Sequence, residues 1–137
     1  MDFSILLNSL LGFGAYFGLS LVFIVVFKFA YALVTPHDEW KLIREDKSVA
    51  AAIGLGGALL GFAIALSGAA SNSVSLIDFA IWGVVALLAQ SIAFLLIRLI
   101  FMPKIVERIE ANEVSAGIML AATSVAVGLL NAACMTY

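Results

Sequence analysis

Polar side chains that interrupt long apolar stretches are the residues of this sequence whose placement points most directly to chemistry. Asp78 is the only carboxylate within a predicted span region, and Gln90 lies near the middle of the same predicted helix. Ionisable and amide groups at membrane depth are costly and mark ion or solute pathways by default. The candidates for a polar pathway, or for a polar cluster at one membrane face, are Asp78, Gln90, Asn131, Asn72 and Ser75.

Each of these residues also has a structural interpretation. Ser75 and Asp78 have the spacing of a capping box, and a carboxylate in the first turn of a helix suits the helix dipole. Gln90 and Asn131 can equally form hydrogen bonds between helices. The sequence therefore leaves two roles open for Asp78, helix capping and contact with an ion or substrate. It also leaves pore lining and helix pairing open for Gln90.

The sequence offers no constellation for catalysis or for a bound metal. It has one histidine, His37, one cysteine, Cys134, and no pair of carboxylates inside an apolar stretch. A nucleophile needs a base beside it, and none is placed for that role. We therefore expect no enzyme activity, no metal and no cofactor. The seven basic residues are few and interleaved with acids, which argues against nucleic acid as a partner.

The elements that carry the candidate residues are transmembrane helices. Of the 137 residues, 64% are hydrophobic and 12% are charged, whereas soluble domains have about a quarter charged residues. A helix needs about 20 apolar residues to cross the hydrocarbon core, and four stretches nearly free of charge meet that length. We predict an all-α integral membrane protein with a single transmembrane domain over residues 1–137. Its spans lie at about 3–34, 48–70, 75–101 and 114–136.

The basic residues predict how these spans are oriented. All of them flank or fill the first or the third connection between spans. They are Lys28, Lys41, Arg44, Lys47, Arg98, Lys104 and Arg108. Because lysine and arginine are enriched in cytoplasmic loops, we expect both charged connections in the cytoplasm and both termini outside.

The first charged connection is expected to have structure of its own. Thr35, Pro36 and Asp38 have the pattern of a helix start, with Thr35 as N-cap and Pro36 at the first helical position. The residues that follow form a short amphipathic cytoplasmic segment at the membrane interface. This segment is either a solvated surface or a docking surface for a cytoplasmic protein partner. The docking candidates are Trp40, Lys41, Arg44 and Lys47.

The two halves of the chain resemble each other. The pattern Val-x-Ala-x-Ile-x-Leu begins at Val49 after the first charged connection and again at Val114 after the second. Each half contains two spans, so the halves would be parallel in the membrane rather than inverted. We therefore predict two parallel two-helix repeats.

The second and fourth helices are rich in Gly, Ala and Ser and nearly lack aromatic residues. Small residues let membrane helices approach closely, so we expect these two helices inside and the first and third facing lipid. The packing candidates recur at helical spacing. They are Gly54, Gly57, Gly61, Gly68, Gly117 and Gly128. These faces serve either packing within one chain or a homo-oligomeric interface, and we expect a homo-oligomer because four short helices bury little surface alone.

Several motifs resemble those of one known family. They are Thr35-Pro36-x-x-Glu39-x-x-Leu42-Ile43-Arg44, Ala50-Ala51-Ala52-x-x-Leu55-Gly56-Gly57, Asn72-Ser73-Val74-Ser75-x-x-Asp78-x-x-x-Trp82-Gly83 and Gly128-Leu129-x-Asn131-Ala132-Ala133-x-Met135-Thr136. Together they are similar to the YjfL-like family of small inner-membrane proteins, domain of unknown function 350, over almost the whole chain. One departure is that Asp46-Lys47 replaces the usual Gly-Asn pair before the second helix. The resemblance implies a bacterial inner-membrane protein with four spans and supplies no activity.

Two functions remain open from the sequence. Polar residues placed among Gly-rich helices favour a small homo-oligomeric channel or transporter. The charged connections favour a non-transporting scaffold that docks a cytoplasmic partner, and the resemblance suggests a membrane-stress role for it. In both cases the lipid bilayer is a partner of the chain.

Overall fold

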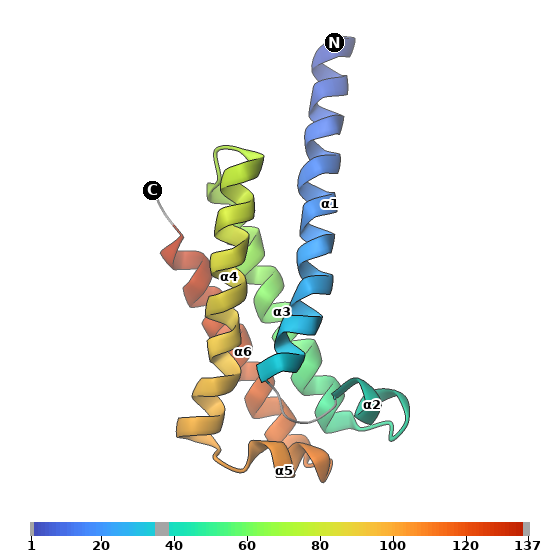
Figure 1. Cartoon of the computed structure of the whole chain (residues 1–137), viewed down its shortest axis with the longest axis vertical. Helices are drawn as coiled ribbons and strands as arrows, with labels where there is room; N and C mark the ends of the chain where they lie inside the picture. Colours follow the sequence, from blue (N-terminus) through green and yellow to red (C-terminus); the bar gives the residue numbers. More distant parts are fainter. Residues whose placement is uncertain (1, 35–38, 136–137) are drawn as a thin grey trace.

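The computed structural model describes residues 2–34 and 39–135, of which Glu39 and Trp40 are described by their backbone alone. Four long helices dominate this part of the chain, and it contains no strand (Figure 1). They are α1 (Phe3–Val34), α3 (Val49–Asn72), α4 (Leu76–Leu96) and α6 (Val114–Cys134). All four spans are long and apolar enough to cross a membrane. The prediction of an all-helical integral membrane fold is confirmed.

The ends of the long helices follow local chemistry. The side chain of Ser48 caps α3 by accepting a hydrogen bond from the backbone N–H of Ala51, and Ser75 caps α4 in the same way. The third span does not stop at Leu96, because a five-residue π-helix, η1 (Ile97–Phe101), extends it. Pro103 follows that segment and cannot continue a helix.

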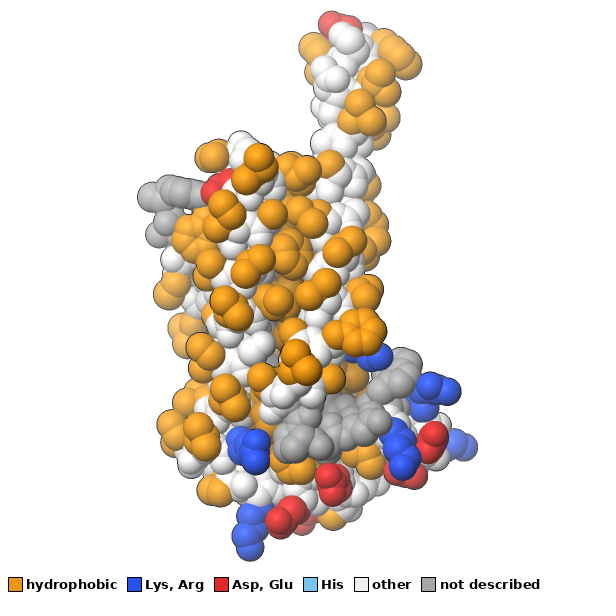
Figure 2. All heavy atoms as spheres, in the orientation of Figure 1, with side chains coloured by type: hydrophobic (Ala, Val, Ile, Leu, Met, Phe, Trp, Pro, Cys, Tyr) orange, Lys and Arg blue, Asp and Glu red, His pale blue; other side chains and the backbone are white. Residues whose placement is uncertain are grey.

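The bundle has two chemically different ends. Two short helices, α2 (Glu39–Arg44) and α5 (Ile105–Glu110), lie together at one end, which we call the charged end (Figure 1). Lysine and arginine side chains gather toward it in Figure 2. The opposite end carries the turn between α3 and α4, at residues 73–75, and we call it the turn end. Both the start of α1 and the end of α6 point toward the turn end.

The two connections at the charged end have the same layout. Each consists of a short helix, a turn and the first residue of a long helix. In each turn one residue adopts a positive φ, 51° at Lys47 and 57° at Asn112, directly before the N-cap residue. Asparagine tolerates this left-handed conformation, whereas lysine does not favour it. Lys47 therefore adopts a backbone conformation that suits Gly or Asn.

The core lies around α3. Half of its most apolar window is buried, compared with 28% for the span formed by α4 and η1, 22% for α6 and 11% for α1. The expectation of an interior helix is confirmed for α3, whereas α6 is buried no more than α4, since six residues of each 21-residue helix are buried. The reason is that α4 lies against α1, α3 and α6, whereas α6 packs mainly on α3 and α4 and exposes Ile118 and Leu130 on its other side.

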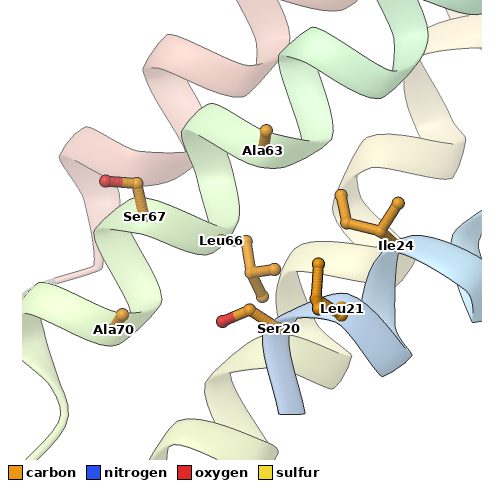
Figure 3. A pocket seen from close by; sticks show the side chains of 7 residues that line it. All are labelled: Ser20, Leu21, Ile24, Ala63, Leu66, Ser67 and Ala70. Atoms are coloured by element: carbon orange, nitrogen blue, oxygen red, sulfur yellow. The ribbon is translucent and has the colours of Figure 1, made fainter. Parts of the chain in front are cut away.

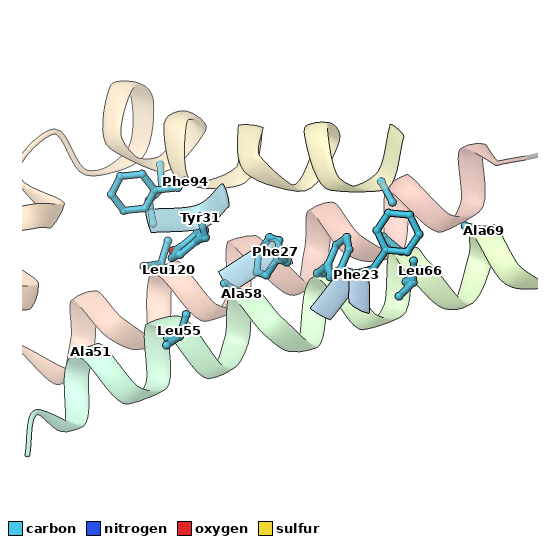
Figure 4. Packing of buried hydrophobic residues seen from close by; sticks show 14 of the residues in the cluster. Phe23, Phe27, Tyr31, Ala51, Leu55, Ala58, Leu66, Ala69, Phe94 and Leu120 are labelled. Carbon is cyan, nitrogen blue, oxygen red and sulfur yellow. The ribbon is translucent and has the colours of Figure 1, made fainter. Parts of the chain in front are cut away.

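Aromatic rings attach α1 to the bundle. Phe27 stacks on Phe62 of α3 with 4.6 Å between ring centroids, and Tyr16 stacks on Phe79 of α4 at 5.3 Å. Phe23, which Figure 4 shows beside Phe27 on α1, meets Phe79 edge-on. Such pairs contribute about 0.5–1.5 kcal/mol each beyond the area that they bury. Large rings therefore hold α1 in place, whereas small residues hold α3 against α6.

Candidate functional site

The small-residue face of α3 is filled by α6. A Cβ added at Gly57 would collide with the backbone of Ala121, and one added at Gly128 would collide with the carbonyl of Gly61. The same close approach recurs along the two helices, since a Cβ at Gly68 would lie 2.7 Å from the Cβ of Ala132. This face is therefore occupied within one chain, and an interface between copies needs a different surface.

Gly54 differs from the other five packing candidates in the atoms that it faces. A Cβ at Gly54 would meet the end of the Leu120 side chain at 3.0 Å, and a side chain can move aside. A Cβ at Gly117 would instead collide with the backbone carbonyl of Ala50 in the first turn of α3. Gly117 is therefore required for the close helix approach at the charged end, whereas Gly54 tolerates some change.

Gln90 lies where three helices meet. Its Nε2 donates a hydrogen bond of 2.6 Å to the backbone carbonyl of Ser124 on α6, and its side chain is 1% exposed. A Cβ at Gly61 of α3 would lie 2.5 Å from that same Nε2, so the glycine gives the amide its room. The Gln90 Oε1 and the Ser124 Oγ are buried without a hydrogen-bond partner in the described part of the chain. We call Gly61, Gln90 and Ser124 the middle layer, and it has unused hydrogen-bonding capacity.

Lys28 lies deeper in the bundle than its place in the sequence predicted. It belongs to α1, next to Phe27, whose ring stacks on Phe62 in the middle of α3. Phe62 in turn follows Gly61, so Lys28 is at about the height of the middle layer. The Lys28 Nζ lies 4.9 Å from the ring centroid of Phe29. A long lysine side chain can extend its ammonium along the helix toward the interface.

Asp78 has the position of a helix cap. Its backbone N–H donates to the Ser75 Oγ at 3.1 Å, and its Oδ2 accepts from the backbone N–H of Val74 at 2.9 Å. The two bonds satisfy donors at the start of α4 that would otherwise have no helical partner. The structure therefore shows the capping role for Ser75 and Asp78.

The predicted polar cluster at one membrane face does not form as a unit. The Asn131 Nδ2 donates to the carbonyl of Ala86 at 3.3 Å, and Ala86 follows Asp78 by eight residues, about 12 Å along α4. The Asn72 Nδ2 donates to the carbonyl of Gly68 within its own helix at 2.8 Å. Asp78, Asn131 and Gln90 thus lie at three successive heights and are not brought together.

The docking candidates at the charged end are solvent-accessible where they are described. Lys41, Arg44 and Lys47 are exposed. The side chain of Trp40 and the helix start predicted at Thr35, Pro36 and Asp38 lie outside the described residues. Within residues 2–34 and 39–135, His, Cys, Asp and Glu do not gather into a group of three that can hold a metal ion.

Asn112 is a structural residue that the sequence interpretation missed. Its Oδ1 accepts from the Ser48 Oγ at 3.2 Å and from the backbone N–H of Ala50 at 3.0 Å. One side chain from the turn before α6 therefore accepts hydrogen bonds from the N-cap residue and from a backbone N–H in the first turn of α3. The available signal was an asparagine at the end of a short helix, a place where a left-handed residue commonly ends the helix.

A second feature that the sequence interpretation missed is a stripe on the half of α1 toward the turn end, which we call the α1 stripe. Its members are small or polar and recur at steps of three or four. They are Ser4, Asn8, Gly12, Ala15 and Gly18. Gly12 is half-buried and the others are exposed, and a Cβ added at Gly12 or Gly18 would meet no described atom within 4 Å. The helical spacing that identified the faces of α3 and α6 would also have identified this one.

Comparisons with known proteins agree on one family. The family model described as Domain of Unknown Function (DUF350) matches residues 4–135. The chain is 42% identical to the UPF0719 inner membrane protein YjfL of Escherichia coli (strain K12), covering 96% of this chain and 98% of that protein. It is 27% identical to the UPF0719 transmembrane protein YshE of Bacillus subtilis (strain 168), covering 92% and 94%. No solved structure matches the chain. With its four spans and these matches, the chain belongs to the DUF350 family of membrane proteins.

Proposed function

We propose that the chain functions as a homo-oligomeric channel or transporter whose subunits meet through the α1 stripe. The observation that carries this proposal is that the stripe is accessible on a helix buried less than any other span. Every other long helix has a face of close contact inside the chain. The α1 stripe has no such contact with the described residues at Gly12 or Gly18, although it has the residue types that such a face requires.

The height of α1 supports a partner for this segment. Tyr16 stacks on Phe79, which is four residues from the N-cap Ser75, so residues 3–11 extend past the turn end of the bundle (Figure 1). That is about 14 Å of helix at 1.5 Å per residue. The segment is strongly apolar and exposed. Neighbouring copies would cover its apolar side chains, and they would give the Asn8 amide a hydrogen-bond partner that lipid cannot give.

Asn8 gives the proposed interface its polar contact. Its amide lies on the α1 stripe, four residues after Ser4 and four before Gly12. An amide in an apolar helix favours association because hydrogen bonds across helices satisfy it away from water. A symmetric contact between copies would place Asn8 opposite Asn8. The small residues at Gly12 and Ala15 would let the two backbones approach.

In this proposal the pathway across the membrane forms between copies. The sequence candidates Asp78, Gln90 and Asn131 make hydrogen bonds inside one chain, so a pathway lined by them alone lacks support. The α1 stripe would line the outer part of the pathway with Ser4 and Asn8. Lys28, which is half-buried on α1 at the height of the middle layer, would supply a polar group further in. We include no catalytic role in the proposal.

We infer an inner-membrane location with the charged end in the cytoplasm and both termini outside. The location rests on the relatives named as inner membrane proteins. The orientation rests on the basic residues of the charged end and on the positive-inside rule. Reporter domains fused after Tyr137 test the orientation. A periplasmic reporter active at this site agrees with it, and a cytoplasmic reporter active there contradicts it.

Flux through purified protein tests the function. Protein in liposomes loaded with potassium chloride should release ions faster than empty liposomes, and Asn8→Leu should reduce the release. Leu10→Ala is a matched control, because Leu10 is exposed on a different side of the same helix turn. Release that stays at the level of empty liposomes for ions and small neutral solutes would contradict a channel or transporter.

The alternative function is a scaffold that docks a cytoplasmic protein. The observation that favours it is that Lys41, Arg44 and Lys47 are exposed around one short helix. A protein captured by the wild-type chain and lost on changing all three to Gln would support docking. Lys104→Gln, at the other connection, is the control for a general loss of charge. Capture that is equal for both variants would contradict a docking role for this segment.

A further inference from the structure

A crevice lies between α1 and α3 in the half of the bundle nearer the turn end. Its volume is about 240 Å³. Leu21 and Ile24 of α1 form one wall, and Ala63, Leu66 and Ala70 of α3 form the other (Figure 3). The alanines on α3 leave the space open, because a larger side chain at either position would enter it.

The walls of the crevice are apolar in character. The two polar residues that line it are Ser20 and Ser67. The Ser20 Oγ donates to the carbonyl of Tyr16 at 2.7 Å, so its hydrogen bond is already made inside α1. A water molecule in a buried site needs two to four polar partners, and this crevice offers too few of them. The chemistry of the walls therefore suits a hydrocarbon group.

The crevice is continuous with the lipid-facing surface of the bundle. Leu21 is 50% exposed, and Ala63 and Ser67 at the rim are also exposed. Both walls belong to membrane-spanning helices, so the opening faces the hydrocarbon of the bilayer. An unfilled space would remove the dispersion contacts of its lining. Ala63 and Ala70 are seven residues apart, so the α3 wall is about 10 Å long and runs along the helix.

From this geometry we propose that the crevice binds one alkyl chain of a membrane phospholipid, lying parallel to α1 and α3. The bound chain fills the gap between the two helices. It thereby fixes the middle of α1, at Leu21 and Ile24, relative to α3. Binding depends on shape and dispersion, because lipid tails are as apolar as the leucine that they contact.

Photo-crosslinking in nanodiscs tests this site. The probe is a phosphatidylethanolamine with a diazirine near the middle of one acyl chain. Adducts should concentrate on Leu21, Ile24 and Leu66, and they should persist when excess free fatty acid or detergent is added. Competition by fatty acid or detergent at this site would overturn the assignment to a phospholipid. Adducts spread evenly over exposed lipid-facing residues would overturn the site itself.

A filled-crevice variant makes the test specific. Ala63→Phe places a ring in the space and should abolish the adducts on Leu21 and Ile24. Ala52→Phe is the matched control, because Ala52 is exposed on α3 toward the charged end and away from the crevice. Circular dichroism establishes that both variants are folded. Equal adduct yields in both folded variants would overturn the proposal.

Discussion

Replacement of Gly61 by alanine is a sharp test of the helix packing in this protein. Gly61 lies on α3 where α4 and α6 meet, and an added Cβ would collide with the carbonyl of Ser124 and lie 2.5 Å from the Gln90 Nε2. A backbone carbonyl cannot rotate aside as a side chain can. The Gly61→Ala variant must therefore separate α3 from α6, displace Gln90, or do both.

The expected loss of folding stability is the sum of two costs, and a third contribution is equal in Gly61→Ala and in the control variant. Overpacking in a close-packed core costs about 1–3 kcal/mol. Loss of the Gln90–Ser124 hydrogen bond adds about 1 kcal/mol. Alanine is a better helix former than glycine by about 0.5–1 kcal/mol, and this gain is the same at any interior position of α3. The matched control is Gly56→Ala, since a Cβ at Gly56 meets no described atom within 4 Å. We expect Gly61→Ala to be about 2–4 kcal/mol less stable than Gly56→Ala.

The assay is reversible unfolding of the purified protein in mixed micelles with increasing SDS. Circular dichroism gives the helical content, and tryptophan fluorescence, measured in a Trp40→Phe background so that Trp82 alone emits, reports on α4. Both variants are compared with the wild type at one micelle composition. Equal midpoints for Gly61→Ala and Gly56→Ala would refute the inference that α3 and α6 meet backbone to backbone at this point.

Three further predictions concern the turns and caps. Asn112→Ala should destabilise the protein by about 1–3 kcal/mol in the same assay, because two hydrogen bonds to the start of α3 and a favourable left-handed residue are lost; an unchanged midpoint contradicts this. Lys47→Asn should stabilise it by about 1 kcal/mol because lysine is strained at a φ of 51°, and a lowered midpoint argues against strain there. Asp78→Ala should lower the midpoint by about 0.5–2 kcal/mol, and Asp78→Asn should have a smaller effect because an amide oxygen can still accept from Val74. Equal effects of the two Asp78 changes would contradict the capping role.

The helices and their membrane character were predictable from the sequence because each depends only on the residues of one short segment of the chain. Length and apolarity alone define the spans, and the small residues of α3 were sufficient to predict that it is buried. The layout of the charged end was predictable in part. Asn112 could not be paired with Ser48 from the sequence, since the pairing depends on how two distant turns are brought together.

The relative positions of polar residues along the bundle axis were not predictable when the residues lie on different helices. Asn131 and Asp78 both lie close to the turn end along the chain, but α6 pairs Asn131 with Ala86, deeper along α4. Lys28 was expected at the edge of the membrane, and the stack of Phe27 on Phe62 places it near the middle of α3. Tilt and axial shift decide which residues share a layer, and a single sequence does not record them.

The similar burial of α4 and α6 and the exposure of the α1 stripe were not predicted for a related reason. Small residues show that a helix can approach a neighbour closely, without showing how many neighbours surround it. α6 uses its small residues on one side alone. On α1 the many aromatic residues predicted a lipid-facing helix. Several of them face α3 and α4 instead, and the α1 stripe lies on another side of the helix.

Disulfide crosslinking along α1 tests the central claim, that copies of the chain meet through the α1 stripe. The single native cysteine, Cys134, is first changed to Ser. Cysteines are then placed singly at Asn8 and Ala15 on the stripe and at Leu10 and Phe17 on a different side of the same exposed segment. After oxidation in native membranes, the account predicts covalent dimers for Asn8→Cys and Ala15→Cys and monomers for the other two. Dimers at Leu10 and Phe17 with none on the stripe, or no dimers at any of the four positions, would contradict it.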